Sequence, residues 1–159
     1  MKPLRRIDGR AVIRLFMLLA LVVFSVAGVM AEPVDEQTII DAVKLANALE
    51  GQYWDDPGAF RTREQLYAHY RQGYSAAIAE RMTQYTLTHN GDAATWVPDE
   101  VHVVSLDEDA AVAWFRTPPA FAEHGSWGFE PFMVVRLRRE GARWVIYWAT
   151  DSATPPPAP

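Results

Sequence analysis

Hydrophobic residues between positions 34 and 53 recur every three or four residues, which is the spacing of one face of an α-helix. The positions on or beside this face are Ile39, Ile40, Val43, Ala46, Leu49 and Tyr53. Asp35 can cap the start of this helix, and Gly51 is expected to end it. The sequence Thr62-Arg63-Glu64-Gln65 is a capping box that predicts a second helix. A third helix is expected from about Ser75 to Thr86.

The hydrophobic period changes to two after residue 99, which indicates strands. Four strands are predicted, at 100–106, 111–116, 132–139 and 143–150. The last two form a hairpin, in which Trp144, Ile146 and Trp148 are expected on one buried face. Helices followed by antiparallel strands predict an α+β fold, with the helices packed on one face of a curved antiparallel sheet of about four strands.

The first 31 residues have the pattern of a secretory signal peptide. Five Lys or Arg residues precede an uncharged stretch from Leu15 to Val29, and the small residues Val29 and Ala31 flank Met30. A retained membrane anchor is the alternative, because residues 15–31 reach the lower limit of a spanning helix, roughly 17 residues. Both interpretations place residues 32–159 outside the cytoplasm. We expect one α+β domain over 32–152 and a Pro-rich disordered tail over 153–159.

Charge and cysteine content narrow the possible functions of residues 32–159. This part holds ten Lys and Arg against nineteen Asp and Glu, a formal net charge of −9. Nucleic-acid binding depends on clustered basic residues that neutralise phosphates, so we do not expect it. The chain has no cysteine, which excludes disulfides, thiol catalysis and cysteine-based metal sites. No sequence motif indicates a cofactor, so none is expected.

The order of elements and the final hairpin, VVRLRREGARWVIYW over residues 134–148, resemble the nuclear transport factor 2-like (NTF2-like), cystatin-like superfamily. The resemblance covers most of residues 35–150 and implies a cone-like α+β fold. The pattern AxxxxxQYW…RTREQL…GYS also resembles small exported wall-associated bacterial proteins, including secreted inhibitors of cell-wall endopeptidases. Because this fold hosts enzymes, binding proteins and inhibitors alike, the resemblance implies a fold rather than one function.

Histidines offer few candidate sites for chemistry. No HxxxH or HExxH pattern is present, so no metal site is expected. His69 and His89 are interpreted as surface residues. The pair Asp99 and His102 is the one catalytic candidate, because enzymes of the resembling fold use such pairs for acid–base chemistry. A solvent-facing histidine at position 102 is the favoured interpretation.

Aromatic residues suggest two binding regions. A set on the helices can line a pocket that orients a small ligand, or it can simply fill the core: Tyr53, Trp54, Tyr70 and Tyr74, together with Tyr67 and Tyr85. A second set, on the loop after residue 118, can contact a partner or fold back over the sheet: His124, Trp127 and Phe129.

The sequence favours an exported, non-catalytic domain that binds an envelope protein or a small ligand at the bacterial cell envelope. One alternative is a secreted inhibitor of a cell-wall hydrolase. Another is a small lyase or isomerase with an acid–base pair in its pocket. Membrane contact is expected only through residues 15–31, if that segment is not cleaved.

Overall fold

A computed structural model describes residues 35–89, 95–122 and 129–157 of the chain. The elements follow in the order α2 (Glu36–Asp55), η1 (Pro57–Ala59), α3 (Arg63–Tyr70), α4 (Ala76–Thr88), β1 (His102–Leu106), β2 (Ala110–Arg116), α5 (Pro119–Ala122), β3 (Phe132–Glu140) and β4 (Arg143–Ser152). The predicted α+β fold, with helices before a four-stranded antiparallel sheet, is confirmed. The predicted leader lies outside the described residues. Within the described part, no helix is both long and apolar enough to span a bilayer.

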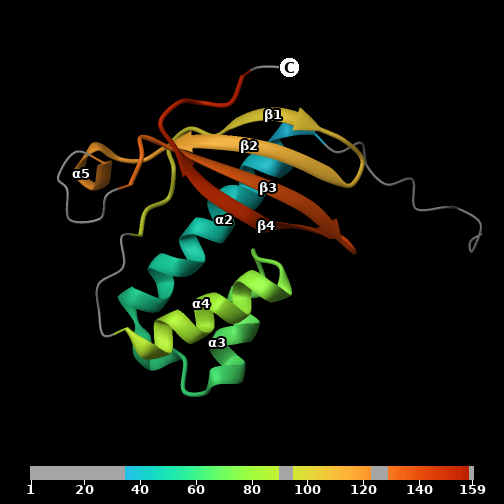
Figure 1. The fold of residues 1–159 in the computed structure, drawn as a ribbon. Helices are drawn as coiled ribbons and strands as arrows, with labels where there is room; N and C mark the ends of the chain where they lie inside the picture. The colour runs from blue at the N-terminus through green and yellow to red at the C-terminus, as the bar shows by residue number, and fades with distance from the viewer. Residues whose placement is uncertain (1–34, 90–94, 123–128, 158–159) are drawn as a thin grey trace, which may run out of the picture. The chain divides into compact units, whose positions relative to one another are not determined.

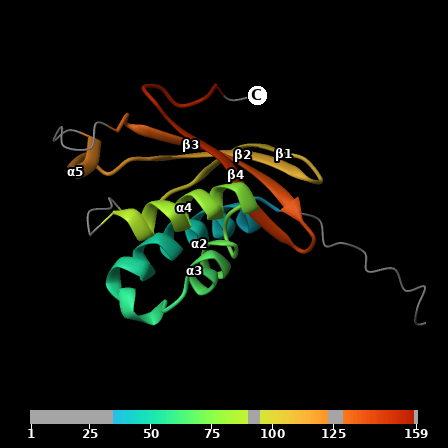
Figure 2. The ribbon, with the colours of Figure 1, turned by 60° about the horizontal axis from the view of Figure 1, so that its bottom comes forward.

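The helices and the sheet form two layers (Figures 1 and 2). All three long helices lie on the same side of the sheet, and α2 contacts both edge strands, β1 and β4. The core between the layers combines the apolar stripe of α2 with inward residues of the strands, including Phe115, Val135 and Leu137. Helix α2 therefore packs on the sheet, α4 also contacts β4, and α3 packs against α2 and α4.

Helix α2 begins where the sequence predicts. The Asp35 carboxylate accepts a hydrogen bond from the Thr38 backbone N–H at 2.8 Å, which satisfies one free donor of the first turn. The prediction that Gly51 ends the helix is wrong, because α2 continues to Asp55. The last turn carries Tyr53, which packs against the core. This packing offsets the weak helical preference of glycine.

The α3–α4 connection approaches α2 closely at Gly73. A Cβ atom at this position would lie 2.7 Å from the Ala46 Cα atom, closer than real Cβ contacts allow. The next residue, Tyr74, forms a parallel bridge with Ile146 of β4. Two backbone hydrogen bonds of 2.9 Å, from Ser75 N–H to Ile146 and from Ile146 N–H to Gly73, hold this bridge. The connection thus links the helical layer to the sheet edge.

The sheet is a meander in the order β1-β2-β3-β4. Its last hairpin turns at Gly141, whose φ of 66° suits the first central position of a type II′ turn. A bulge then shifts the register, because Arg136 pairs with Trp148 whereas Leu137 pairs with Ile146.

This bulge turns Trp148 away from the core. The side chain is 39% exposed, and the Arg136 guanidinium lies 4.8 Å from the centre of a Trp148 ring. The prediction that Trp148 shares the buried face with Trp144 and Ile146 is therefore wrong. An extra residue in one strand reverses the alternation beyond it.

Candidate functional site

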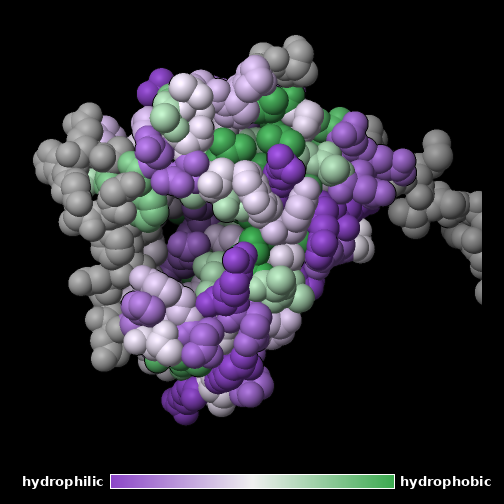
Figure 3. Space-filling model, in the orientation of Figure 1, coloured by the Kyte–Doolittle hydropathy of each residue, from purple (hydrophilic) through white to green (hydrophobic). Residues whose placement is uncertain are grey.

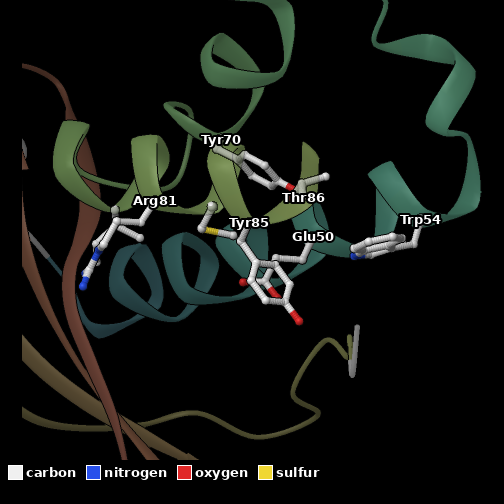
Figure 4. A pocket seen from close by; sticks show the side chains of 8 residues that line it. Glu50, Trp54, Tyr70, Arg81, Tyr85 and Thr86 are labelled. Carbon is white, nitrogen blue, oxygen red and sulfur yellow. The ribbon is translucent and has the colours of Figure 1, made fainter. Parts of the chain in front are cut away.

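A cavity of about 340 Å³ lies among the three long helices. Its volume is at the lower end of the range of ligand pockets, roughly 300–1,000 Å³. Figure 3 shows that the surface is hollowed between the helical layer and the sheet. The cavity is lined by Glu50 and Trp54 of α2, Tyr70 of α3, and Ile78, Arg81, Met82, Tyr85 and Thr86 of α4 (Figure 4).

Glu50 is the acidic group of this cavity. It follows Ala46 by four residues, so it continues the stripe that is otherwise buried and apolar. Oε1 of Glu50 accepts a hydrogen bond from the Tyr74 hydroxyl at 2.8 Å. Within the described residues, no hydrogen bond or salt bridge involves Oε2. In this part of the chain, one carboxylate oxygen of Glu50 is thus hydrogen-bonded and the other is not.

Burial raises the pKa of Glu50 above its ordinary value, and the Tyr74 hydrogen bond opposes this only in part. The cause is desolvation, which penalises the charged form of the carboxyl group. A carboxyl group in a cavity with a perturbed pKa is a recognised indicator of a functional site. A leucine or methionine at position 50 would avoid this cost.

Two tyrosines belong to the surroundings of Glu50: Tyr74 binds its carboxyl group, and Tyr70 lines the same cavity. Tyr70 and Tyr74 are both buried, and the Tyr70 hydroxyl lies 3.0 Å from Oγ1 of Thr86. Burial raises the pKa of Tyr70 to about 12 and that of Tyr74 well above its ordinary value of 10.0. Both phenols therefore stay protonated at neutral pH, and the Tyr74 hydroxyl can donate to Glu50.

An aromatic row connects the end of α2 with α3. The Tyr53 ring lies 5.0 Å from that of Trp54 and 5.9 Å from that of Phe60, measured between ring centroids. Phe60 in turn lies 4.4 Å from His69, which is 5.4 Å from Tyr70. Three members of the helical aromatic set predicted from sequence line the cavity: Trp54, Tyr70 and Tyr85. Tyr74 binds the carboxyl group of Glu50, and Tyr53 contacts Trp54.

His69 does not lie on the surface, as the sequence had suggested. It is 7% exposed, and its Nε2 lies 2.7 Å from the Leu49 carbonyl oxygen. The ring fills the space between helices while that hydrogen bond satisfies its polar edge. His89 is exposed, as predicted, and stacks on Tyr85 at 3.9 Å.

Two of the residues with which α4 lines the cavity are exposed. Tyr85 is 42% exposed, and Arg81 is also exposed. In Figure 4 the Arg81 side chain lies well apart from Glu50, with Trp54 at the opposite end of the view. Arg81 and Glu50 form no salt bridge, so the Glu50 carboxylate has no cationic partner among the described residues.

Asp99 and His102 do not form the predicted pair. The His102 Nε2 atom lies 3.7 Å from an exposed carboxylate oxygen of Glu100, and its ring stacks on Trp114 at 4.1 Å. The Asp99 backbone carbonyl accepts a hydrogen bond from Lys44. Both residues line a second cavity, of about 470 Å³, whose walls include four prolines. His102 is exposed, as favoured from the sequence.

The predicted aromatic loop is only partly described. His124 and Trp127 lie outside the described residues. Phe129 is partly buried, and its ring centroid lies 6.0 Å from that of Trp96, which also stacks on Phe121 at 5.2 Å. Phe129 therefore packs against a neighbouring aromatic cluster. In the described ranges, no group of three or more His, Asp or Glu residues converges as a metal site would require.

Five residues of the helical cavity were missed from sequence: Glu50, Ile78, Arg81, Met82 and Thr86. One of them had a usable signal. An acidic residue at an apolar position of an amphipathic helix is expensive to bury, so Glu50 could have been identified as a candidate. The residues of α4 had no such signal, because their role depends on how α4 packs beside α2.

Comparisons with protein-family models, with curated proteins and with solved structures found no match.

Proposed function

We propose that this protein is an exported, non-catalytic binding domain of the bacterial cell envelope, and that it takes a small ligand in the cavity among α2, α3 and α4. The observation that carries this proposal is Oε2 of Glu50, which has no hydrogen bond or salt bridge to the described part of the chain and belongs to a cavity with three aromatic side chains. Binding pockets combine mostly apolar walls with a few polar groups that orient the ligand. The signal-peptide pattern of residues 1–31 supports the proposed location at the cell envelope.

The resemblance to the NTF2-like, cystatin-like superfamily is part of this proposal. The order of elements supports it, since three helices precede a four-stranded meander and the α3–α4 connection bridges to β4. In such an arrangement, helices cover one face of a sheet and leave room for a ligand between elements. The fold itself selects no ligand.

A fragment screen by NMR tests ligand binding directly. The full-length chain, labelled with ¹⁵N, is titrated with a library of neutral, cationic and anionic fragments. We expect shift changes to concentrate on residues that line the cavity, and Met82→Trp to abolish them by filling it. His102→Ala, at the second cavity, is the matched control and should leave the hits unchanged. If no fragment shifts the cavity residues, ligand binding at this site is refuted.

The proposed export of the protein to the cell envelope needs a separate measurement. N-terminal sequencing of the protein from the cell envelope or the medium should give a chain that begins at Glu32. An intact N-terminus on membrane-bound protein would instead support the anchor. Recovery of all the protein from the cytoplasm would contradict export.

A second function, acid–base catalysis by a small lyase or isomerase, is favoured by one observation. Glu50 is a carboxyl group whose pKa is raised by burial, as suits a general acid or base near neutral pH. This moves the proposed chemistry from Asp99 and His102 to Glu50. Incorporation of deuterium from D₂O next to the carbonyl group of bound ketones would reveal it. The exchange should stop in Glu50→Gln, and its absence in the wild type would leave binding alone.

A further inference from the structure

We propose that the ligand of the helical cavity carries an organic ammonium group, which Glu50 binds while the aromatic side chains contact the rest of the molecule. This inference rests on the proposed ligand-binding function and names the chemical class of the ligand. It depends on three features of the cavity: a carboxyl group with no cationic partner among the residues that the structure describes, aromatic rings around it, and few competing polar groups.

Only one oxygen of the Glu50 carboxyl group has a hydrogen bond to a described residue. Tyr74 donates a hydrogen bond to Oε1 of Glu50, which favours the ionised form. No described residue contributes a positive charge to Oε2. A charged donor from a ligand would therefore complete the site, because hydrogen bonds between ammonium and carboxylate groups are about twice as strong as neutral ones.

The walls of the cavity suit a cation and an apolar body. Trp54, Tyr70 and Tyr85 present aromatic rings from three helices. Aromatic faces attract cations within about 6 Å through the ring quadrupole, and they also provide apolar contact area. Ile78 and Met82 add aliphatic surface and thioether sulfur on the same side. Such walls favour an amine with a hydrocarbon or aromatic part over a strongly hydrated ion.

The other polar groups of the cavity compete little with Glu50. The Tyr70 and Thr86 hydroxyls lie 3.0 Å apart and bond to each other. Arg81 is exposed and lies away from Glu50 (Figure 4), so solvent screens its charge from the interior of the cavity. The net charge of −9 for residues 32–159 also favours the approach of cations.

The test uses three molecules of similar shape and different charge: phenethylamine, 2-phenylethanol and 3-phenylpropionate. Each is titrated into the full-length chain at pH 7.5, and its Kd is taken from shifts of the cavity residues. We expect the amine to bind at least about tenfold more tightly than the alcohol, as one charge-assisted contact predicts. The carboxylate should bind most weakly.

Glu50→Gln is the decisive variant, because it keeps the shape of the side chain and removes its charge. It should weaken binding of the amine by about 10- to 100-fold and change binding of the alcohol by less than about threefold. Glu108→Gln, in the exposed turn between β1 and β2, removes the same charge at a remote place and should change neither Kd. Urea unfolding confirms that both variants fold.

The outcomes separate this inference from the proposed function. If the alcohol binds as tightly as the amine, or Glu50→Gln leaves the amine unaffected, the ammonium inference is overturned and ligand binding stands. Tighter binding of the alcohol would instead indicate that a protonated Glu50 donates to a neutral acceptor. If none of the three molecules binds, the inference is overturned, and the fragment screen decides on the function.

Discussion

The Tyr74 hydroxyl donates to Oε1 of Glu50 at 2.8 Å, across the junction between α2 and the segment that bridges to β4. Tyr74 is 24 residues from Glu50 in the chain. The tyrosine is placed by the sheet edge, whereas the glutamate is placed by its helix. The orientation of the carboxyl group in the cavity therefore depends on how the two layers are joined.

The raised pKa of Glu50 predicts how stability depends on pH. Below its ordinary value of 4.5, the carboxyl group is protonated in both the folded and the unfolded chain. As the pH rises, the unfolded chain releases this proton first, so the free energy of unfolding falls until the pH passes the folded-state pKa. Glu50→Gln removes this pH-dependent loss of stability, because glutamine does not titrate. The glutamine side-chain oxygen can still accept the hydrogen bond from Tyr74. Its stability relative to the wild type should therefore increase between pH 4 and pH 8.

Urea unfolding at several pH values measures this difference. The slope should not exceed about 1.4 kcal/mol per pH unit, the limit for one proton. Glu108→Gln is the control, since its exposed side chain should show no comparable gain. A difference between Glu50→Gln and the wild type that stays constant from pH 4 to pH 8 would falsify the raised pKa.

Tyr74→Phe tests the hydrogen bond itself. The variant keeps the ring in the core but leaves Oε1 of Glu50 without its donor. We expect a loss of about 0.5–1.5 kcal/mol in the free energy of unfolding at neutral pH. The pKa of Glu50 should rise further, because the lost bond opposed its increase.

Tyr67→Phe is the matched control for this measurement. Tyr67 lies in α3 and is partly buried, and its hydroxyl has no hydrogen bond within the described ranges. The change should cost less than about 0.5 kcal/mol, as is usual away from specific interactions. Equal losses in the two variants would mean that the bond to Glu50 contributes nothing particular to stability.

Two glycines should respond in opposite directions to alanine. Gly51→Ala places a methyl group inside α2, where the nearest atom outside the helix is Oγ1 of Thr95 at 3.9 Å. It should stabilise the protein by about 0.5–1 kcal/mol, because alanine loses less backbone entropy in a helix. Gly73→Ala would bring a methyl group within 2.7 Å of the Ala46 backbone. Thermal unfolding should show a loss of about 1–3 kcal/mol.

This prediction holds only if Gly51→Ala raises the free energy of unfolding and Gly73→Ala lowers it. A stabilising Gly73→Ala would show that the connection is not packed against α2 at that point. A destabilising Gly51→Ala would show that the helix does not continue through residue 51.

Much of the fold could be predicted from sequence because its local signals are consistent. The cap at Asp35, the capping residue Thr62 and the turn at Gly141 each correspond to a boundary in the structure. The change of hydrophobic period separates the helices from the strands. Each of these signals depends on a few neighbouring residues, so it can be recognised from the sequence without knowing the tertiary structure.

The cavity and the buried histidine could not be predicted in the same way. Glu50 and Tyr85 line one cavity, but they come from helices whose packing depends on contacts far apart in sequence. His69 is buried because the Leu49 carbonyl group is placed beside it. Glycine composition likewise does not distinguish Gly51, which a helix tolerates, from Gly73, which close packing requires.

The bulge in the last hairpin provides the final prediction. The alternation of the sequence assigns Trp144 and Trp148 to the same face, but the extra residue leaves Trp144 7% exposed and Trp148 39% exposed. Trp144→Ala should cost about 3–5 kcal/mol in urea unfolding, because it opens a hole in the core. Trp148→Ala loses the contact with Arg136, which is worth about 0.5–1 kcal/mol at an exposed site. Similar losses for both tryptophans would mean that β4 runs without a bulge and that Trp148 faces the helices.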